Sequence, residues 1–182
     1  MSDDVAMMRR AIEQARRGDR EPGANGIGCV ITRDGDILAE GFNEVDLRHD
    51  PTAHAEIVAL RHAAHLLGNY RLPECEIYVT LEPCAMCAMA LLHARVKRVV
   101  YGASDPKAGA AGSVIDVFGN AVLNHHTSVL GGVLGEESGT VLRSFFAERR
   151  EQYRQRRSAG RPVGNDPIPA GDAIELDFGD TR

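Results

Sequence analysis

Residues 80–87 read Thr-Leu-Glu-Pro-Cys-Ala-Met-Cys, and with Pro-Thr-Ala-His-Ala-Glu at residues 51–56 this stretch decides the fold. Residues 76–81 have the β-branched and aromatic composition of a strand. Pro83 then opens a predicted helix, because the missing N–H of proline costs nothing at a helix start. The second stretch introduces another predicted helix, roughly residues 53–67. Both stretches therefore bring potential metal ligands to the start of a helix.

The rest of the chain predicts further strands and amphipathic helices around these two. An Asp-Gly pair between two apolar runs predicts a β-hairpin, and apolar residues three and four apart predict helices. The predicted elements are helix 3–18, strands 28–32 and 37–43, helix 53–67, strand 76–81, helix 83–94, strand 96–103, a short edge strand 128–133 and helix 136–157. Residues 104–127 predict a long loop, and such a loop in a compact domain is usually functional. This order predicts an α/β fold, a three-layer α-β-α sandwich around one mixed sheet of about five strands.

Length and composition predict a single globular domain. The chain has 182 residues, 43% of them hydrophobic and 26% charged. We predict a catalytic domain over residues 1–157 and a disordered acidic tail over residues 158–182, which is rich in Pro and Gly. The first residues are acidic, unlike a signal peptide, and no apolar run approaches the roughly 20 residues of a membrane span. We therefore expect a cytoplasmic protein without membrane contact, whose cysteines are reduced.

The chemistry predicted from the residues is that of a catalytic zinc site. Cys84 and Cys87 are three apart at a helix start, where the helix dipole and free N–H groups favour thiolates. With His54 they make three ligands, which leaves the fourth tetrahedral position open, as catalytic zinc requires. Glu56 lies two residues after His54 and can carry protons without being a ligand. We expect one Zn²⁺ per subunit.

Other interpretations of these motifs stay open at this point. A Cys-x-x-Cys pair alone is also typical of a redox site, and a lone His-x-Glu occurs by chance in many proteins. The two motifs together favour zinc. Cys29 and Cys75 lack such partners, and we expect them to be small core or surface residues. The histidines predicted to lie outside the metal site are His62, His65, His93, His125 and His126.

His-Ala-Glu followed by Pro-Cys-x-x-Cys resembles the signature of the cytidine and nucleoside deaminase superfamily. The resemblance is strongest to the bacterial tRNA wobble adenosine deaminases and covers approximately residues 4–157. It rests on residues 49–57, 69–72, 78–84, 109–113 and the Phe pair at 145–146. It implies a cytidine-deaminase-like fold and hydrolytic deamination of the wobble adenosine to inosine in an arginine tRNA anticodon loop, with release of ammonia. It also implies a homodimer that grips the tRNA anticodon stem-loop.

The resemblance further implies substrate contacts. Asn43 corresponds to a residue that contacts the base or sugar, Asp105 to one near the substrate backbone, and Phe146 and Arg149 to residues that touch the anticodon loop. From its position in the predicted loop, Lys107 is a further phosphate-binding candidate. Each has a plainer alternative, such as a turn residue, a packed ring or a solvated helix face. The net charge of −5 argues against bulk electrostatic binding of nucleic acid, whereas the arginines of residues 149–157 form a local basic stretch.

One stretch departs from the family pattern. Where relatives commonly have Val-Pro-Val-Gly-Ala, this chain has Asn-Gly-Ile-Gly-Cys at residues 25–29, close to the expected base pocket. Two alternatives to the tRNA enzyme therefore remain. One is a deaminase of a free base or nucleoside, such as guanine, cytosine or adenosine. The other is a zinc-stabilised RNA-binding module without catalysis, which the presence of Glu56 disfavours.

Overall fold

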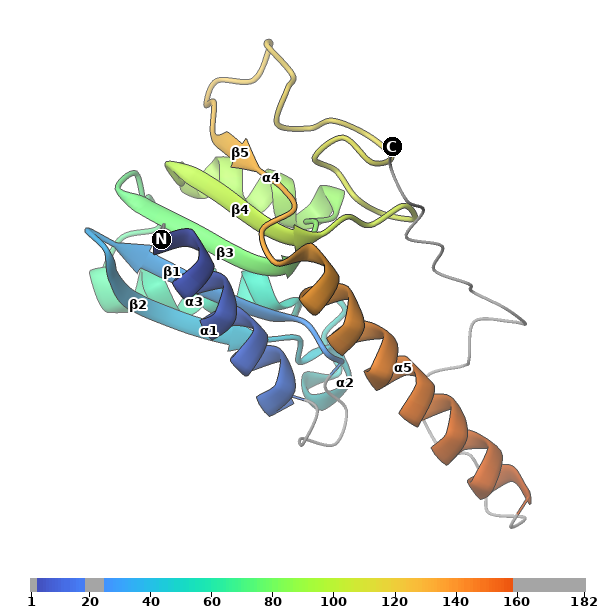
Figure 1. The fold of residues 1–182 in the computed structure, drawn as a ribbon. Coiled ribbons are helices and arrows are strands. Elements are labelled where there is room, and N and C mark those ends of the chain that lie inside the picture. Colours follow the sequence, from blue (N-terminus) through green and yellow to red (C-terminus); the bar gives the residue numbers. More distant parts are fainter. Residues whose placement is uncertain (1–2, 19–24, 159–182) are drawn as a thin grey trace.

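The computed structural model describes residues 3–18 and 25–158, which form one sheet with helices on both faces (Figure 1). The elements in chain order are α1 (Asp3–Gly18), β1 (Gly28–Arg33), β2 (Asp36–Phe42), α2 (Val45–Arg48), α3 (Ala55–Leu67), β3 (Cys75–Leu81), α4 (Ala85–Ala94), β4 (Arg98–Ala103), β5 (Ser128–Leu130) and α5 (Gly135–Ser158). A loop over residues 104–127 joins β4 to β5, as predicted.

The five strands form one mixed sheet in the order β2-β1-β3-β4-β5. β1 pairs antiparallel with both β2 and β3, whereas β3, β4 and β5 run parallel to one another. The predicted mixed sheet is therefore confirmed. Because β3 and β4 are parallel, their connection must cross over the sheet, and α4 makes that crossover. The arrangement brings the carboxyl ends of β3 and β4 to the same edge as the start of β1.

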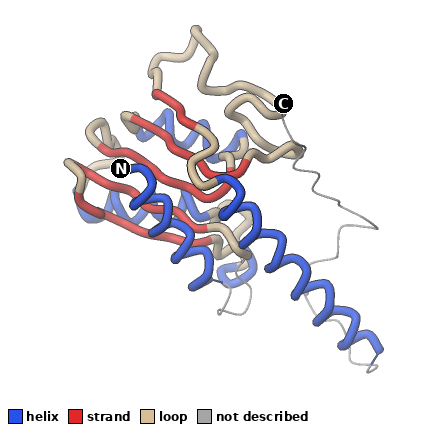
Figure 2. The backbone as a smooth tube through the Cα atoms, viewed as in Figure 1, coloured by secondary structure: helices blue, strands red, loops and turns tan. Residues whose placement is uncertain are grey.

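Each face of the sheet is covered by its own helices, which completes the predicted three layers (Figures 1 and 2). Met8 and Ile12 of α1 and Val141 of α5 pack against Val30 and Val100 on one face. α3 and α4 cover the opposite face in a larger core that also takes in part of the 104–127 loop. Adjacent Val99 and Val100 belong to different cores, so β4 is buried on both faces, as its sequence predicts.

The element boundaries differ from the prediction at a few functional positions. α3 and α4 begin at Ala55 and Ala85, so His54 and Cys84 are their N-cap residues rather than residues of the first turn. The short helix α2 was not predicted, since its four residues include none that is buried. β5 is shorter than expected and ends at Leu130. The predicted tail lies outside the described residues, apart from Ser158 at the end of α5.

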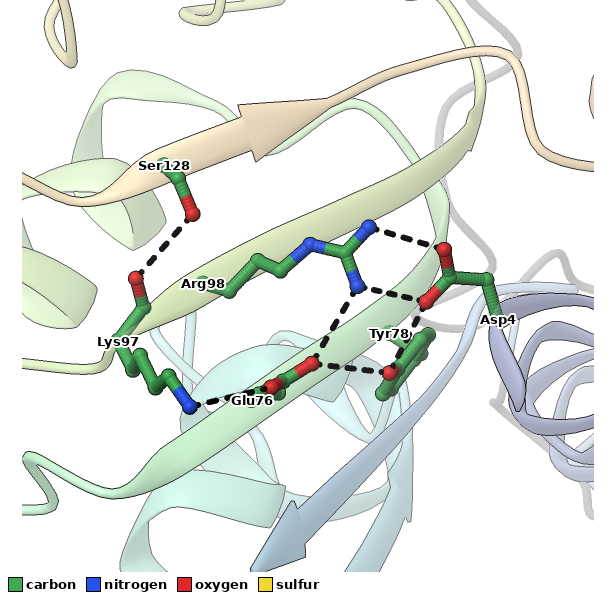
Figure 3. A network of polar contacts seen from close by, with 6 residues as sticks. All are labelled: Asp4, Glu76, Tyr78, Lys97, Arg98 and Ser128. Atoms are coloured by element: carbon green, nitrogen blue, oxygen red, sulfur yellow. Dashed lines mark hydrogen bonds and ion pairs between the residues drawn. The ribbon is translucent and has the colours of Figure 1, made fainter. Parts of the chain in front are cut away.

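A partly buried polar network joins α1 to the amino ends of β3 and β4, which lie opposite the carboxyl ends of these strands (Figure 3). Arg98 donates to both carboxylate oxygens of Asp4, at 2.6 and 2.9 Å, and to Glu76 at 3.3 Å. The Tyr78 hydroxyl lies between the same two carboxylates. The network joins α1, β3 and β4 through side chains up to 94 residues apart. Within the described residues, no helix combines the length and apolar character needed to cross a membrane.

Candidate active site

Three predicted metal ligands converge at the carboxyl end of β3. His54 is the N-cap of α3 and Cys84 the N-cap of α4, and neither side chain makes the usual cap hydrogen bond to the start of its helix. Both side chains are therefore available to a ligand. Cys87 lies in the first turn of α4 and is buried. Of the described residues, these three form the one group of potential metal ligands whose donor atoms all lie within 4.8 Å of one another.

The separations of the three donor atoms fit a tetrahedral zinc ion. His54 Nδ1 lies 3.7 Å from Cys84 Sγ and 3.5 Å from Cys87 Sγ. Ligands at the usual Zn–S and Zn–N distances, placed at a tetrahedral angle, are about 3.6 Å apart. The set of one imidazole and two thiols also matches the preference of zinc for nitrogen and sulfur. The residues present thus fit the metal, and the three that converge within the described part of the chain would leave the fourth tetrahedral position to water or substrate.

Contacts among His54, Cys84 and Cys87 shift the pKa values of His54 and Cys84. The pKa of Cys84 is lowered to about 4, chiefly by its hydrogen bond with Cys87 and further by its contact with His54. A lowered pKa favours the thiolate form, in which cysteine binds a metal. The pKa of His54 is raised, mainly by the same contact with Cys84. Thiolate formation at this position favours a cation.

Glu56 lies beside the ligand group without belonging to it. Its side chain is only 4% exposed, in the first turn of α3. Burial raises the pKa of Glu56 to about 6, although contacts with His54 and Cys87 oppose that rise. A carboxyl group whose pKa lies near the working pH is suited to accept and release protons. Burial raises the pKa of the Cys29 thiol, and the neighbouring Glu56 carboxylate raises it further.

The other predicted site residues differ in burial and in hydrogen bonding. Asn43 is 3% exposed, and its Oδ1 accepts the N–H of Val45 at 3.1 Å, which holds the start of α2. Within the described part of the chain this is its one side-chain hydrogen bond, so its amide N–H groups remain for a ligand. Asp105 Oδ1 accepts the N–H groups of Lys107 and Ala108, a role in the turn of the loop. Lys107 is exposed.

Phe146 and Arg149 lie on α5, a helix that packs on the sheet at its start and extends away from it at its end. Phe145 packs into the core, while Phe146 is 38% exposed and meets the Phe145 ring edge-on, with the ring centres 5.4 Å apart. Phe146 is therefore not on the apolar side of the helix that its spacing suggested. The Arg149 guanidinium lies 5.4 Å from the centre of the Phe145 ring. Beyond that point α5 extends away from the body of the molecule (Figure 1).

Comparison with known proteins identifies the family of this site. A family model for the zinc-binding region of cytidine and deoxycytidylate deaminases matches residues 1–103. The tRNA-specific adenosine deaminase of Haemophilus influenzae is 48% identical over 150 residues, which are 82% of this chain and 86% of that protein. The chain belongs to the tRNA-specific adenosine deaminase family. The expected zinc cofactor and hydrolytic deaminase class are thereby confirmed, and the redox interpretation of Cys84 and Cys87 was wrong.

Two solved structures are similar to this chain in both sequence and fold. One, from a study of A-to-I editing by tRNA:A34 deaminases at the wobble position, has a TM-score of 0.71 and 41% identity, and the match covers 76% of this chain and 99% of that one. The guanine deaminase of Bacillus subtilis has 43% identity and a TM-score of 0.53, over 54% of this chain and 63% of that one. The predicted cytidine-deaminase-like fold is confirmed by these matches.

Glu82, which no sequence pattern indicated as a site residue, lies two residues before the proposed metal ligand Cys84. This carboxylate is 2% exposed and receives hydrogen bonds from the 104–127 loop. One signal was available: a charged residue stands between a buried strand and a proline, where exposure to water is poor. The partners could not be predicted, because they lie 23–31 residues further along a segment without periodicity.

Proposed function

We propose that the protein deaminates the wobble adenosine of a tRNA anticodon to inosine, with an arginine tRNA as its substrate. The observation that carries the proposal is the convergence of His54, Cys84 and Cys87, with buried Glu56 beside them but outside the ligand group. That arrangement suits hydrolysis at a carbon of a heteroaromatic ring, which needs an activated water and a proton carrier. Family membership supports the RNA substrate.

His54, Cys84 and Cys87 hold zinc, which when bound supplies the Lewis acidity that makes water nucleophilic near neutral pH. Glu56 accepts a proton from the water that adds to C6 of the adenine and delivers it to a ring nitrogen. It then moves a second proton to the amino group, which leaves as ammonia while the ring keeps the oxygen. The buried position of Glu56 excludes bulk water from this transfer.

Substrate contacts come from three parts of the chain. The amide N–H groups of Asn43 bind an acceptor on the edge of the base or on the ribose, since its Oδ1 already accepts the N–H of Val45. Phe146 stacks on an unpaired base of the loop, and Arg149 and Lys107 bind phosphates. Asp105 shapes the loop that bears Lys107. The exposed ring of Phe146 and the exposed position of Lys107 support these roles.

The working unit is a homodimer of deaminase domains spanning residues 1–157, with residues 158–182 as a separate acidic tail. The tRNA substrate supports a cytoplasmic location. The far half of α5, which extends away from the body of the subunit, supports a role in gripping RNA or a second subunit (Figure 1).

A second candidate function is deamination of free guanine, which the 43% identity to the Bacillus subtilis guanine deaminase over half of this chain supports. The test compares an anticodon stem-loop with free guanine, cytosine and adenosine as substrates of the zinc-loaded protein. We expect inosine in the stem-loop at the wobble position and ammonia in equal amount. Turnover of guanine without turnover of the stem-loop would reverse the choice between the two.

A further inference from the structure

Glu82 is a buried carboxylate that takes no part in the proposed chemistry, yet four donors of one loop bind to it. Its Oε1 accepts the N–H groups of Ala111 and Ser113, at 2.9 and 3.1 Å. Its Oε2 accepts the N–H of Asp105 at 2.9 Å and the hydroxyl of Ser113. Both ends of the segment 105–113 are therefore tied to a single side chain.

Backbone contacts next to Glu82 bring the same segment onto the metal site. The Pro83 carbonyl accepts the N–H of Ala110 at 2.8 Å, and Cys84 forms an isolated antiparallel bridge with Gly109. A Cβ atom at Gly109 would lie 2.5 Å from the Glu82 carboxylate, so only glycine fits beneath it. The loop thus lies directly against a zinc ligand.

The side of this segment away from Glu82 faces water. Lys107 and Ala108 are exposed, and their N–H groups are held by Asp105 Oδ1, whose own N–H is held by Glu82. Each of these hydrogen bonds therefore depends on the one before it. Glu82 fixes Asp105, Asp105 fixes the turn, and the turn presents Lys107 two residues before Gly109, which pairs with Cys84.

We propose that Glu82 is a positioning residue, which holds the 105–113 segment as a preformed wall of the RNA-binding site. This inference rests on the proposed function. Glu82 acts through the loop and does not touch the reacting base. Preforming the wall removes the entropy cost of ordering the loop when the RNA binds. Its loss should therefore weaken substrate binding far more than the chemical step.

The zinc ligands have independent support, which separates this role from a metal-holding one. The Cys84 carbonyl accepts the N–H of Ala88 at 2.8 Å, which fixes it as the cap of α4, and Cys87 is held in the same helix. His54 is held by α3 through Val58 at 2.9 Å. A variant at Glu82 should thus keep its zinc.

The decisive variant is Glu82→Gln, whose volume is unchanged. An amide has one acceptor oxygen, so its NH₂ group must face either the N–H of Asp105 or those of Ala111 and Ser113. The matched control is Glu76→Gln, a change near the start of β3, whereas Glu82 directly follows the end of that strand; Glu76 belongs to the network with Arg98. The control should lose stability without any change in KM.

Steady-state kinetics on an anticodon stem-loop, zinc content and amide hydrogen exchange of the holoenzyme test the proposal together. We expect Glu82→Gln to raise KM by about 10- to 100-fold, with kcat within about threefold and zinc at the wild-type level. The amides of Asp105, Ala111 and Ser113 should exchange faster, while those of α4 should not. Ser113→Ala, which removes only the hydroxyl donor, should give a smaller change in the same direction.

An unchanged KM in Glu82→Gln, or loss of zinc and kcat in parallel, overturns the positioning role. The exchange measurement keeps this result separate from the proposed function. If the wild-type protein does not turn over the stem-loop, the proposed function fails, yet exchange of the 105–113 amides still decides whether Glu82 holds the loop. Unchanged exchange there also overturns the proposal.

Discussion

At residue 56 the chain places a carboxylate in a site that already has its metal ligands. We predict that Glu56→Ala keeps zinc at the wild-type level but lowers kcat by about 10²- to 10⁴-fold, because the proton carrier is lost while the three ligands remain. Zinc analysis and single-turnover deamination measure the two effects. Activity within tenfold of wild type would exclude Glu56 as the proton carrier.

The opposite pattern is expected at Cys87, which is buried in the first turn of α4. Cys87→Ala removes one of the three proposed zinc ligands, so both metal and activity should be lost. The melting temperature should also fall, because binding a structural or catalytic metal contributes to the stability of the fold. Addition of a chelator to the wild-type protein should reproduce the fall, and should have little effect on the variant. A zinc-replete, active Cys87→Ala protein would contradict this assignment.

At this scale the sequence predicts residues whose partners are fixed by short spacing. His54, Cys84 and Cys87 could be found because each stands at a helix start, and two helix starts at one sheet edge bring them together. Glu82 could not be found, because its partners come from a loop that no periodicity places. The helical spacing of Phe146 also allowed a packed ring, yet its side chain is 38% exposed while that of Phe145 is buried.

Among the elements, the packing of α1 on β1 depends on one position. A Cβ atom at Gly28 would lie 2.0 Å from the Ala11 carbonyl oxygen and 2.4 Å from the Ala15 nitrogen, both in the backbone of α1. Backbone cannot move aside as a side chain does. We predict that Gly28→Ala lowers the free energy of unfolding by about 1–3 kcal/mol or more, because the helix must shift off the sheet.

Gly139, in the buried part of α5, is the matched control for this change. The nearest atom to a Cβ there is the mobile end of Arg143, at 3.1 Å, and alanine favours a helix over glycine by about 0.5–1 kcal/mol. Gly139→Ala should therefore be neutral or stabilising in a denaturant titration in which Gly28→Ala unfolds early. Equal midpoints for the two variants would contradict the close approach of α1.

The existence of most elements was predictable, but their ends were less so. Apolar periodicity identifies α1, because it reports which face is buried, and β-branched and aromatic composition identifies β3. The starts of α3 and α4 fall two residues after the predicted ones, since prolines restrict the backbone before a helix without fixing its first hydrogen bond. α2 is too short and too exposed to leave any periodic pattern.

For the whole molecule, the network around Asp4 links stability to pH. The hydrogen bonds from Arg98 lower the pKa of Asp4, whose other charged and titratable neighbours are Glu76 and Tyr78, with Lys97 beside Glu76. A carboxyl group with a lowered pKa stabilises the fold above its unfolded pKa of about 4. That stability is lost as the pH falls through the lower folded value.

We therefore predict that Asp4→Asn lowers the free energy of unfolding by about 1–3 kcal/mol at pH 7, since a charge-assisted pair between distant elements is lost. The gap between wild type and variant should narrow as the pH is lowered from about 5 toward 2. Urea midpoints across that range measure it. A gap that is independent of pH would show that the carboxylate charge of Asp4 does not stabilise the fold.

The molecule carries a net charge of −5 and yet is proposed to bind RNA, which requires a local source of positive charge. The far half of α5 provides it: Arg150 and Arg154 are exposed and four residues apart, so they lie on one face of the helix.

If each contacts a phosphate, each alanine substitution should reduce the slope of log Kd against log salt concentration by about 0.7–0.9. The affinity for an anticodon stem-loop should fall, while kcat at saturating RNA stays within about twofold, because the metal site is untouched. Arg33→Ala is the control, since Arg33 pairs with the start of β3 at the edge of the sheet opposite the metal ligands and should leave the slope unchanged. An unchanged slope in the Arg150 and Arg154 variants would mean that the acidic molecule gathers its RNA by other contacts, and that the far half of α5 has a different partner.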